Sequence, residues 1–251
     1  MHRKRRSVVI LLNRKSLSKM AVFAVLAFAV LLVLSYNIPS TKTWTYWTLP
    51  LSGKVIALDA GHGGPDGGAV SKQGVIEKEI NLAIALQLRD FLQQAGAVVV
   101  MTREEDKDLA SQETKGYSKR KSEDLLKRVE FIRNNRSDLL ISIHMNAIPS
   151  PKWSGAQSFY YPKHQDNQLL AALIQDELKR NLENTNRLVK QMPNAVYLMK
   201  AMDIPSALVE VGFLSNPEEA QLLADEKYQK KVAASIYTGI LRYYSGEKVA
   251  L

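Results

Sequence analysis

The sequence of 251 residues contains no cysteine and only four histidines. The absence of cysteine excludes a thiolate metal site and a cysteine nucleophile. The sequence also lacks the Lys-Ser/Thr ending of a phosphate-binding P-loop and the G-x-S-x-G turn of serine hydrolases, which argues against both of those protein classes. A metal centre in this chain therefore has to be built from histidine and carboxylate ligands.

Little net positive charge remains once the N-terminus is set aside. The chain has a formal net charge of +9, and seven of its basic residues lie before residue 20 with no acidic residue among them. The rest of the chain is nearly neutral and has no basic stripe interleaved with aromatic residues. This pattern argues against nucleic acid as a partner.

Residues 1–19 carry the basic cluster, and we expect them to lie in the cytoplasm. A hydrophobic run follows them. Residues 20–34 carry no charge, and Ser35 and Tyr36 extend the run. A bilayer span needs ~20 apolar residues, so a cleaved signal peptide is the alternative. Because no A-x-A-like cleavage site follows, and positive charge favours the cytoplasmic side, we expect residues 20–36 to be an uncleaved transmembrane anchor.

After a linker over residues 37–53, apolar β-type runs alternate with amphipathic helical stretches. We expect strands over 54–60, 97–102, 139–144, 155–161 and 206–213, and helices over 77–94, 125–134, 167–182, 228–244 and from Pro217 onward. This alternation predicts a single α/β domain over residues 54–245, with a largely parallel twisted sheet flanked by helices and a short tail at 246–251. The polar residues 104–123 are expected to form a long surface loop.

Two histidines stand at the ends of predicted strands. His62 follows the run at 54–60, and His144 closes the run at 139–144. Because the carboxyl ends of parallel strands gather at one edge of a sheet, we expect a shared site there. Two histidines need a carboxylate to complete a three-ligand zinc site. Glu77, at the start of a predicted helix after a glycine-rich loop, is the preferred third ligand, and Glu79 is the competitor.

Glu210 lies in an otherwise apolar predicted strand. A buried carboxylate is costly unless it is paired, hydrogen-bonded or close to a metal, whereas on an edge strand it can face water. Its strand is expected to lie beside the two strands that bear histidines. We therefore expect Glu210 to accept a proton from the attacking water and to pass it to a leaving nitrogen. Asp59 and Asp66 are candidates either for orienting His62 or for shaping the turn.

These residues resemble the zinc-dependent N-acetylmuramoyl-L-alanine amidases of the type-3 family. The family's blocks appear in order as residues 58–64 with Asp66, Gly68 and Ala69; Glu77-Lys78 with Asn81-Leu82; Thr102-Arg103 with Asp106; residues 142–147; and residues 205–216, which contain Glu210. The resemblance covers residues 54–243 and implies that Zn²⁺ is bound by His62, Glu77 and His144, with Glu210 as the catalytic carboxylate. It implies a structural role for Arg128.

The resemblance also implies the substrate, which is the amide between the lactyl group of N-acetylmuramic acid and L-alanine of the peptidoglycan stem peptide. The basic head, single anchor and bare catalytic domain are similar to sporulation members of the family. That similarity implies a membrane-anchored or secreted enzyme with an extracytoplasmic catalytic domain, acting in cortex maturation, muramic-lactam formation and germination. It further implies an accessory lipoprotein and a downstream muramic-acid deacetylase.

Two alternatives stay open at the level of the residues. A zinc carboxypeptidase or deacetylase acting on the cell wall would use the same metal site on the same fold. A membrane-tethered wall-binding module would need no catalytic group at all, although all four candidate site residues are present. The segment between Asp106 and the helix at 125–134 is longer than is usual in the family, which leaves the path of that loop open.

Overall fold

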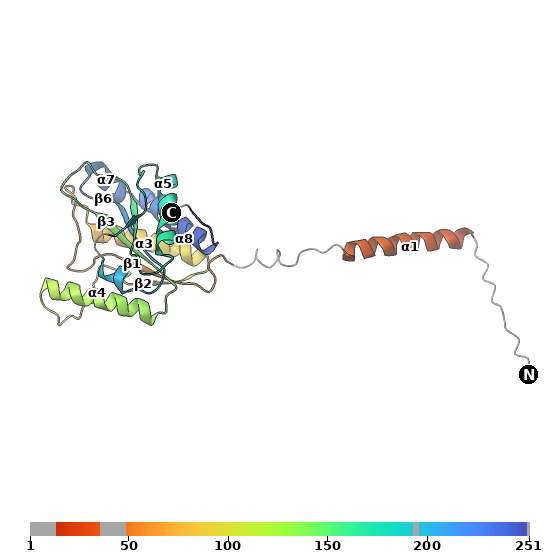
Figure 1. The fold of residues 1–251 in the computed structure, drawn as a ribbon, viewed down its shortest axis with the longest axis horizontal. Coiled ribbons are helices and arrows are strands. Elements are labelled where there is room, and N and C mark those ends of the chain that lie inside the picture. The colour runs from red at the N-terminus through yellow and green to blue at the C-terminus, as the bar shows by residue number, and fades with distance from the viewer. Residues whose placement is uncertain (1–13, 36–48, 193–195, 250–251) are drawn as a thin grey trace, which may run out of the picture. The chain divides into compact units, whose positions relative to one another are not determined.

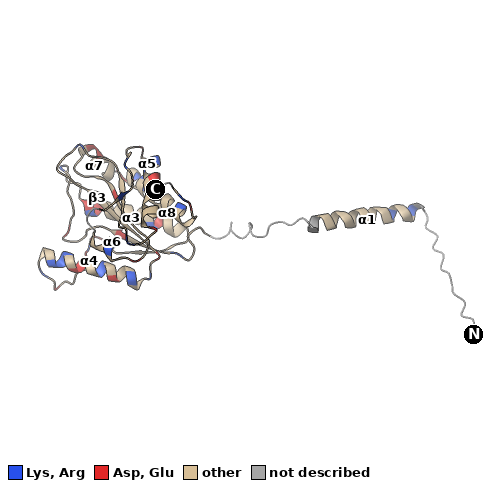
Figure 2. Ribbon diagram, viewed as in Figure 1, with Lys and Arg blue, Asp and Glu red and all other residues tan. Residues whose placement is uncertain are grey.

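The computed structural model describes residues 14–35, 49–192 and 196–249, and the chain divides into two compact units at residue 48. The first unit contains α1 (Arg14–Ser35), a helix that is long and apolar enough to cross a membrane. Figure 2 shows basic residues at only one end of α1. The predicted anchor lies in this helix up to residue 35, whereas most of the predicted cytoplasmic head and linker lies outside the described residues.

The second unit is built on one six-stranded sheet. Its strands are β1 (Val55–Ala60), β2 (Val98–Met101), β3 (Leu139–Asn146), β4 (Gln157–Tyr160), β5 (Lys190–Gln191) and β6 (Ser206–Phe213), in the order β2-β1-β3-β6-β4-β5. Strands β2, β1, β3 and β6 run parallel to one another. Strand β4 is antiparallel to β6, and β5 is parallel to β4. The predicted α/β fold with a largely parallel sheet is confirmed.

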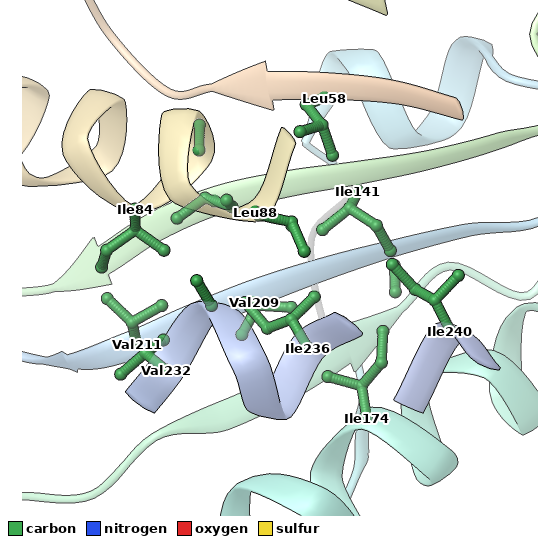
Figure 3. Packing of buried hydrophobic residues seen from close by; sticks show 14 of the residues in the cluster. Leu58, Ile84, Leu88, Ile141, Ile174, Val209, Val211, Val232, Ile236 and Ile240 are labelled. Atoms are coloured by element: carbon green, nitrogen blue, oxygen red, sulfur yellow. The ribbon is translucent and has the colours of Figure 1, made fainter. Parts of the chain in front are cut away.

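Helices cover both faces of this sheet (Figure 1). They are α3 (Glu77–Gln94), α4 (Tyr117–Asn134), α5 (Asn167–Leu182), α6 (Tyr197–Ala201), α7 (Pro217–Ala224) and α8 (Glu226–Tyr244). Because side chains alternate along a strand, the strands contribute side chains to two hydrophobic cores, one on each face of the sheet. Leu58, Ile141 and Val209 belong to the larger core beneath α3, α5 and α8 (Figure 3). The smaller core lies beneath α4 and α6.

The expectation of a loop over residues 104–123 is wrong in its last third, because α4 begins at Tyr117. The first turns of α4 are polar and therefore show no apolar periodicity. They are held instead by tertiary contacts: Arg120 donates two hydrogen bonds to the carboxylate of Asp108, and the Tyr117 hydroxyl donates to Asp66. Contacts of this kind between polar residues leave no periodic signal in the sequence.

Two short elements were not predicted, β5 and α6. Strand β5 has two residues and α6 has five. Neither is long enough to show the alternation of a strand or the 3.6-residue repeat of a helix in the sequence. The start of α7 matches the expectation, because the Asn216 side chain accepts hydrogen bonds from the amides of Glu218 and Glu219, and Pro217 occupies the first turn. The body of the sheet and its long helices therefore follow the sequence pattern, while the short connecting elements do not.

Candidate metal centre

The polar site residues on the strands share one face of the sheet. His144 of β3 is the register partner of Glu210 on β6, and Ser142 is the partner of Asp59 on β1. Their neighbours Leu140 and Leu208 lie in the smaller core beneath α4 and α6, so the alternation of side chains places His144 and Glu210 on that face too. The site residues on the strands therefore lie on the face that α4 and α6 cover.

His62 reaches the same place from the turn after β1. Its φ of 63° lies in the left-handed region, which is uncommon for a residue with a side chain. The rings of His62 and His144 meet edge to face with centroids 5.1 Å apart. A Cβ atom at Gly61 would lie 2.2 Å from Cε1 of His144, so only glycine at this position lets the two rings approach.

Glu77 brings its carboxylate between the two rings from the first turn of α3. Its Oε1 lies 3.2 Å from Nε2 of His62 and 3.3 Å from Nδ1 of His144. The carboxylate is buried and fixed by the backbone amides of Met145, which donates to Oε1, and Ala69, which donates to Oε2. The competing Glu79 is exposed. The structure therefore brings His62, Glu77 and His144 together and leaves Glu79 outside.

The donor set fits a divalent metal ion. One nitrogen from each ring and one oxygen of Glu77 lie within 4.8 Å of one another. Ligands at zinc distances in a tetrahedron are roughly 3.3–3.6 Å apart, close to the two separations measured from Glu77. Burial alone would raise the pKa of Glu77, but hydrogen bonds with His144 and His62 and the charges of these rings lower it well below its usual range. Glu77 is therefore ionised, as a metal ligand must be.

Asp66 is the carboxylate that orients His62. Its Oδ2 lies 2.9 Å from Nδ1 of His62, on the opposite side of the ring from Glu77. The same carboxylate accepts hydrogen bonds from the Gly68 amide and the Tyr117 hydroxyl, and it pairs with Lys121 at 3.0 Å. A carboxylate on the second ring nitrogen is the usual support of a metal-binding histidine. The sequence had offered Asp59 and Asp66 equally for this role.

Asp59 instead forms the centre of a buried polar network beneath the site. It accepts hydrogen bonds from Ser142, Arg128 and Thr102 at 2.6, 2.7 and 2.8 Å. Burial alone would raise its pKa, but the Arg128 charge, the influence of His144 and the hydrogen bonds lower the pKa to about 2. Arg128 also donates to the carbonyl of His62 at 2.7 Å, which holds the strained turn in place. The predicted structural position of Arg128 agrees with these contacts.

Arg103 is a second buried cation, to which the sequence analysis gave no role. It donates hydrogen bonds to the carbonyl groups of Ala60, Gly61 and Lys78, so it connects the end of β1 with the first turn of α3. These are the two segments that carry His62 and Glu77. Its acceptors are backbone atoms, which have no residue signature, so no sequence pattern could have revealed this role.

Glu210 is the fourth residue of the site. Within the described part of the chain, its buried Oε2 has no hydrogen-bond partner. Burial is the main influence on this carboxyl group, and together with the charge of Glu77 it outweighs the opposing effect of His144 and His62 and raises the pKa to about 7. An orphaned carboxylate oxygen beside a metal-type constellation is available for a ligand or a proton. Glu210 is therefore a partly buried residue with a buried Oε2 on an interior strand, rather than a residue that faces water on an edge strand.

A cavity of about 270 Å³ opens beside the two histidines, between the carboxyl ends of β1 and β3 and the helices α4 and α6. Its lining includes His62, His144, Lys121, Leu125 and Leu198. The constellation is thus reached from a space large enough to hold part of a ligand.

Comparison with known proteins agrees with this geometry. Residues 56–242 match the family Amidase_3, N-acetylmuramoyl-L-alanine amidase. The germination-specific N-acetylmuramoyl-L-alanine amidase of Bacillus subtilis is 58% identical over 221 residues, which cover 88% of this chain and 92% of that protein. The amidase LytC of the same organism is 34% identical over 82% of this chain and 38% of its own length.

Solved structures give the same result. The CwlD amidase of Clostridioides difficile, determined in complex with the GerS lipoprotein, matches with a TM-score of 0.75 and 46% identity over 77% of this chain and all of that one. The catalytic domain of CwlV from Bacillus (Paenibacillus) polymyxa matches with a TM-score of 0.66 and 30% identity over 78% of this chain and 99% of that one. The chain therefore belongs to the N-acetylmuramoyl-L-alanine amidase family.

Proposed function

We propose that this protein is a zinc-dependent amidase that hydrolyses the bond between the lactyl group of N-acetylmuramic acid and L-alanine in spore-cortex peptidoglycan. The observation that carries the proposal is the arrangement of His62, Glu77 and His144 around one point, with Glu210 in register beside His144. Family membership supports the choice of bond. The similarity to the germination-specific amidase of Bacillus subtilis supports the choice of the cortex.

The choice of zinc follows from the donor set. Two imidazoles and one carboxylate leave a fourth position open, which is the pattern of catalytic zinc sites, whereas Mg²⁺ and Ca²⁺ favour oxygen ligands. His62, Glu77 and His144 would hold the ion. A zinc ion bound in this way polarises a carbonyl group and lowers the pKa of water. Asp66 would keep His62 in the tautomer that presents Nε2 to the metal.

Glu210 would move the proton. Its carboxylate would accept a proton from the water that attacks the lactyl carbonyl carbon and would deliver it to the alanine nitrogen as the carbon–nitrogen bond breaks. The products are a free lactyl carboxylate on the sugar and a peptide that begins with L-alanine. The buried and unpartnered Oε2 of Glu210 supports this role, because it is free to accept a hydrogen bond from the attacking water.

The amidase domain would act outside the cytoplasm, where peptidoglycan lies. We assign residues 1–19 to a cytoplasmic head, residues 20–36 to the anchor, residues 37–53 to a linker and residues 54–245 to the catalytic domain. The length and apolar composition of α1 support the anchor. A cleaved signal, which would release the domain, is the alternative that N-terminal sequencing of the mature protein would identify.

Two partners belong to the proposal. The related amidase of Clostridioides difficile was solved with a lipoprotein, and we propose that this chain also works with an accessory lipoprotein. Removal of the stem peptide leaves muramic acid with a free lactyl carboxylate. A deacetylase acting on this product would supply the amine with which that carboxylate can close a lactam.

Incubation of the full chain with purified peptidoglycan, followed by mass spectrometry, tests the proposal. We expect free stem peptides that begin with L-alanine, and we expect them to disappear with chelator and with Glu210→Gln, which keeps the size of the side chain. Release of a single terminal residue would indicate a carboxypeptidase, and release of acetate would indicate a deacetylase. Binding to the wall without zinc-dependent release would indicate a wall-binding module.

A further inference from the structure

The cavity beside the candidate metal centre is lined by both apolar and charged side chains. Leu125 of α4 and Val196 and Leu198, which come from the start of α6, line the apolar part. Besides the two histidines, its lining contains two basic side chains, Arg128 and Lys121, and three aspartates that pair with them. These two cations differ in whether they can still bind a ligand.

The hydrogen-bonding groups of Arg128 are already committed to the protein. All three of its nitrogens donate hydrogen bonds: Nε to Asp124, Nη1 to Asp59 and Nη2 to the carbonyl of His62. Its side chain is only 2% exposed. Arg128 therefore supports the site from below and cannot turn towards a ligand without breaking a buried ion pair.

Lys121 lines the cavity and has more donors than its contact with Asp66 uses. Its ammonium has three N–H groups, and its neighbours are Asp66, at 3.0 Å, and the ring of Tyr117. The side chain is 42% exposed. Burial alone would lower the pKa of Lys121, but the hydrogen bond with Asp66 and the charge of Asp66 raise it, so the side chain stays cationic.

Lys121 also lies close to His62, on the side of the ring that faces Asp66. Its Nζ and Nδ1 of His62 both lie within 3.0 Å of the same oxygen, Oδ2 of Asp66. A substrate whose scissile bond lies at the His62 and His144 rings would therefore extend past this ammonium if its peptide followed the cavity. The apolar part of the lining suits a small side chain such as the alanine methyl group.

We propose that Lys121 binds a free carboxylate on the stem-peptide residue that follows L-alanine, and so makes the enzyme select acidic stem peptides. This inference rests on the proposed function. One residue spans at most ~3.6 Å, so a carboxylate on the next residue lies within two residue lengths of the scissile amide. An ammonium–carboxylate hydrogen bond in a partly enclosed cavity is among the stronger polar contacts in proteins.

The competing explanation is that Lys121 acts only through Asp66 and His62, as a positioning residue. Tyr117 offers a matched control, because its hydroxyl donates to Oδ1 of the same carboxylate at 2.9 Å but Tyr117 does not line the cavity. Tyr117→Phe removes support from Asp66 and keeps the cation, whereas Lys121→Met removes the cation and keeps much of the side-chain volume. Lys121→Arg keeps the charge.

The experiment compares two muramoyl stem-peptide fragments that differ only in carrying a carboxylate or a carboxamide on the residue after alanine. With the full chain in detergent, we expect wild-type kcat/KM to favour the carboxylate at least tenfold. Lys121→Met should lower kcat/KM for the carboxylate fragment to the level of the carboxamide fragment. Lys121→Arg should keep part of the preference, and Tyr117→Phe should keep all of it. Bound zinc, measured by mass spectrometry of the metal, should be equal in wild type and Lys121→Met.

Other results would overturn the inference. Equal cleavage of the two fragments by the wild-type enzyme would exclude recognition of the carboxylate. An equal loss on both fragments in Lys121→Met and Tyr117→Phe, together with a fall in bound zinc, would make Lys121 a positioning residue. Cleavage of neither fragment by wild type, with zinc bound, would contradict the proposed function and the inference with it.

Discussion

Glycine at position 61 decides whether two histidines can share one metal ion. The His144 ring occupies the place where any other residue would put its Cβ atom. The sequence shows that a glycine precedes His62. Only the structure shows that this glycine leaves space for the His144 ring. Such a requirement can be tested with the smallest possible addition, a single methyl group.

We expect Gly61→Ala to displace the His144 ring and to weaken zinc binding at least ~10-fold, an effect of the size seen when support of a metal ligand is lost. Gly67→Ala is the matched control in the same loop, because the nearest atom to its added Cβ would be at an ordinary 3.6 Å. Zinc titration monitored by calorimetry measures both variants. Tight zinc binding by Gly61→Ala would show that the two rings do not need to approach as they do here.

Asp59 predicts how stability depends on acid. Its pKa is 3.8 as an unperturbed carboxyl and about 2 in the folded protein, so folding favours the ionised form. Its contribution to the free energy of unfolding is therefore complete above about pH 4 and is lost as the pH falls towards 2. Urea unfolding at pH 5, 4, 3 and 2 measures this loss. Asp59→Asn should be less stable at pH 5 and should lose less stability on acidification, and an unchanged pH profile would contradict the assignment.

The residues of the site were predictable to different degrees. His62, His144 and Glu210 could be placed together because each follows or lies in an apolar strand run, and strand runs are the strongest local signal in the chain. Glu77 could be preferred over Glu79 because it is the first residue of the predicted helix, and the structure leaves Glu79 exposed. The pairing of Lys121 with Asp66 could not be predicted, because charged partners distant in sequence leave no periodic trace.

At the scale of elements, the helix caps carry a testable share of the stability. Asn216 ends the turn after β6 and accepts two amide hydrogen bonds at the start of α7. We expect Asn216→Ala to lower the free energy of unfolding by about 0.5–2 kcal/mol, the usual cost of losing such a cap. Asn216→Asp should be within a few tenths of wild type, because aspartate caps equally well. Equilibrium urea unfolding compares the three proteins, and equal stability of Asn216→Ala would show that the cap contributes nothing.

The same scale shows where sequence patterns stop being informative. The bounds of α3 and α5 agree with their predicted ranges, because apolar residues recur at helical spacing along both. The start of α4 was missed because its first turns are stabilised by partners in the preceding loop and around Asp66 rather than by an apolar stripe. Elements are thus predictable where burial defines them and unpredictable where polar tertiary contacts do.

For the whole molecule, metal binding and folding should be linked. The three candidate ligands come from the turn after β1, from α3 and from β3, so an ion held by them would join segments distant in sequence. Free zinc at 100 times its Kd is expected to add about 2.7 kcal/mol to the free energy of unfolding. Thermal unfolding of the full chain in detergent, with zinc or with chelator, measures the shift. His144→Ala should abolish it, and a zinc-induced shift that survives in this variant would place the metal elsewhere.

The smaller of the two cores gives the protein a chemical weakness of its own. Three of the seven methionines, Met192, Met199 and Met202, are buried together in this core, which supports α6 and one wall of the cavity. In a chain without cysteine, methionine is the only sulfur that an oxidant meets. Conversion of these thioethers to sulfoxides would introduce three polar oxygens beneath α6, whereas the larger core holds only Met101 and Met145 among a much greater number of aliphatic side chains. Oxidation of this core would thus loosen the packing of α6 and of the cavity residues beside it.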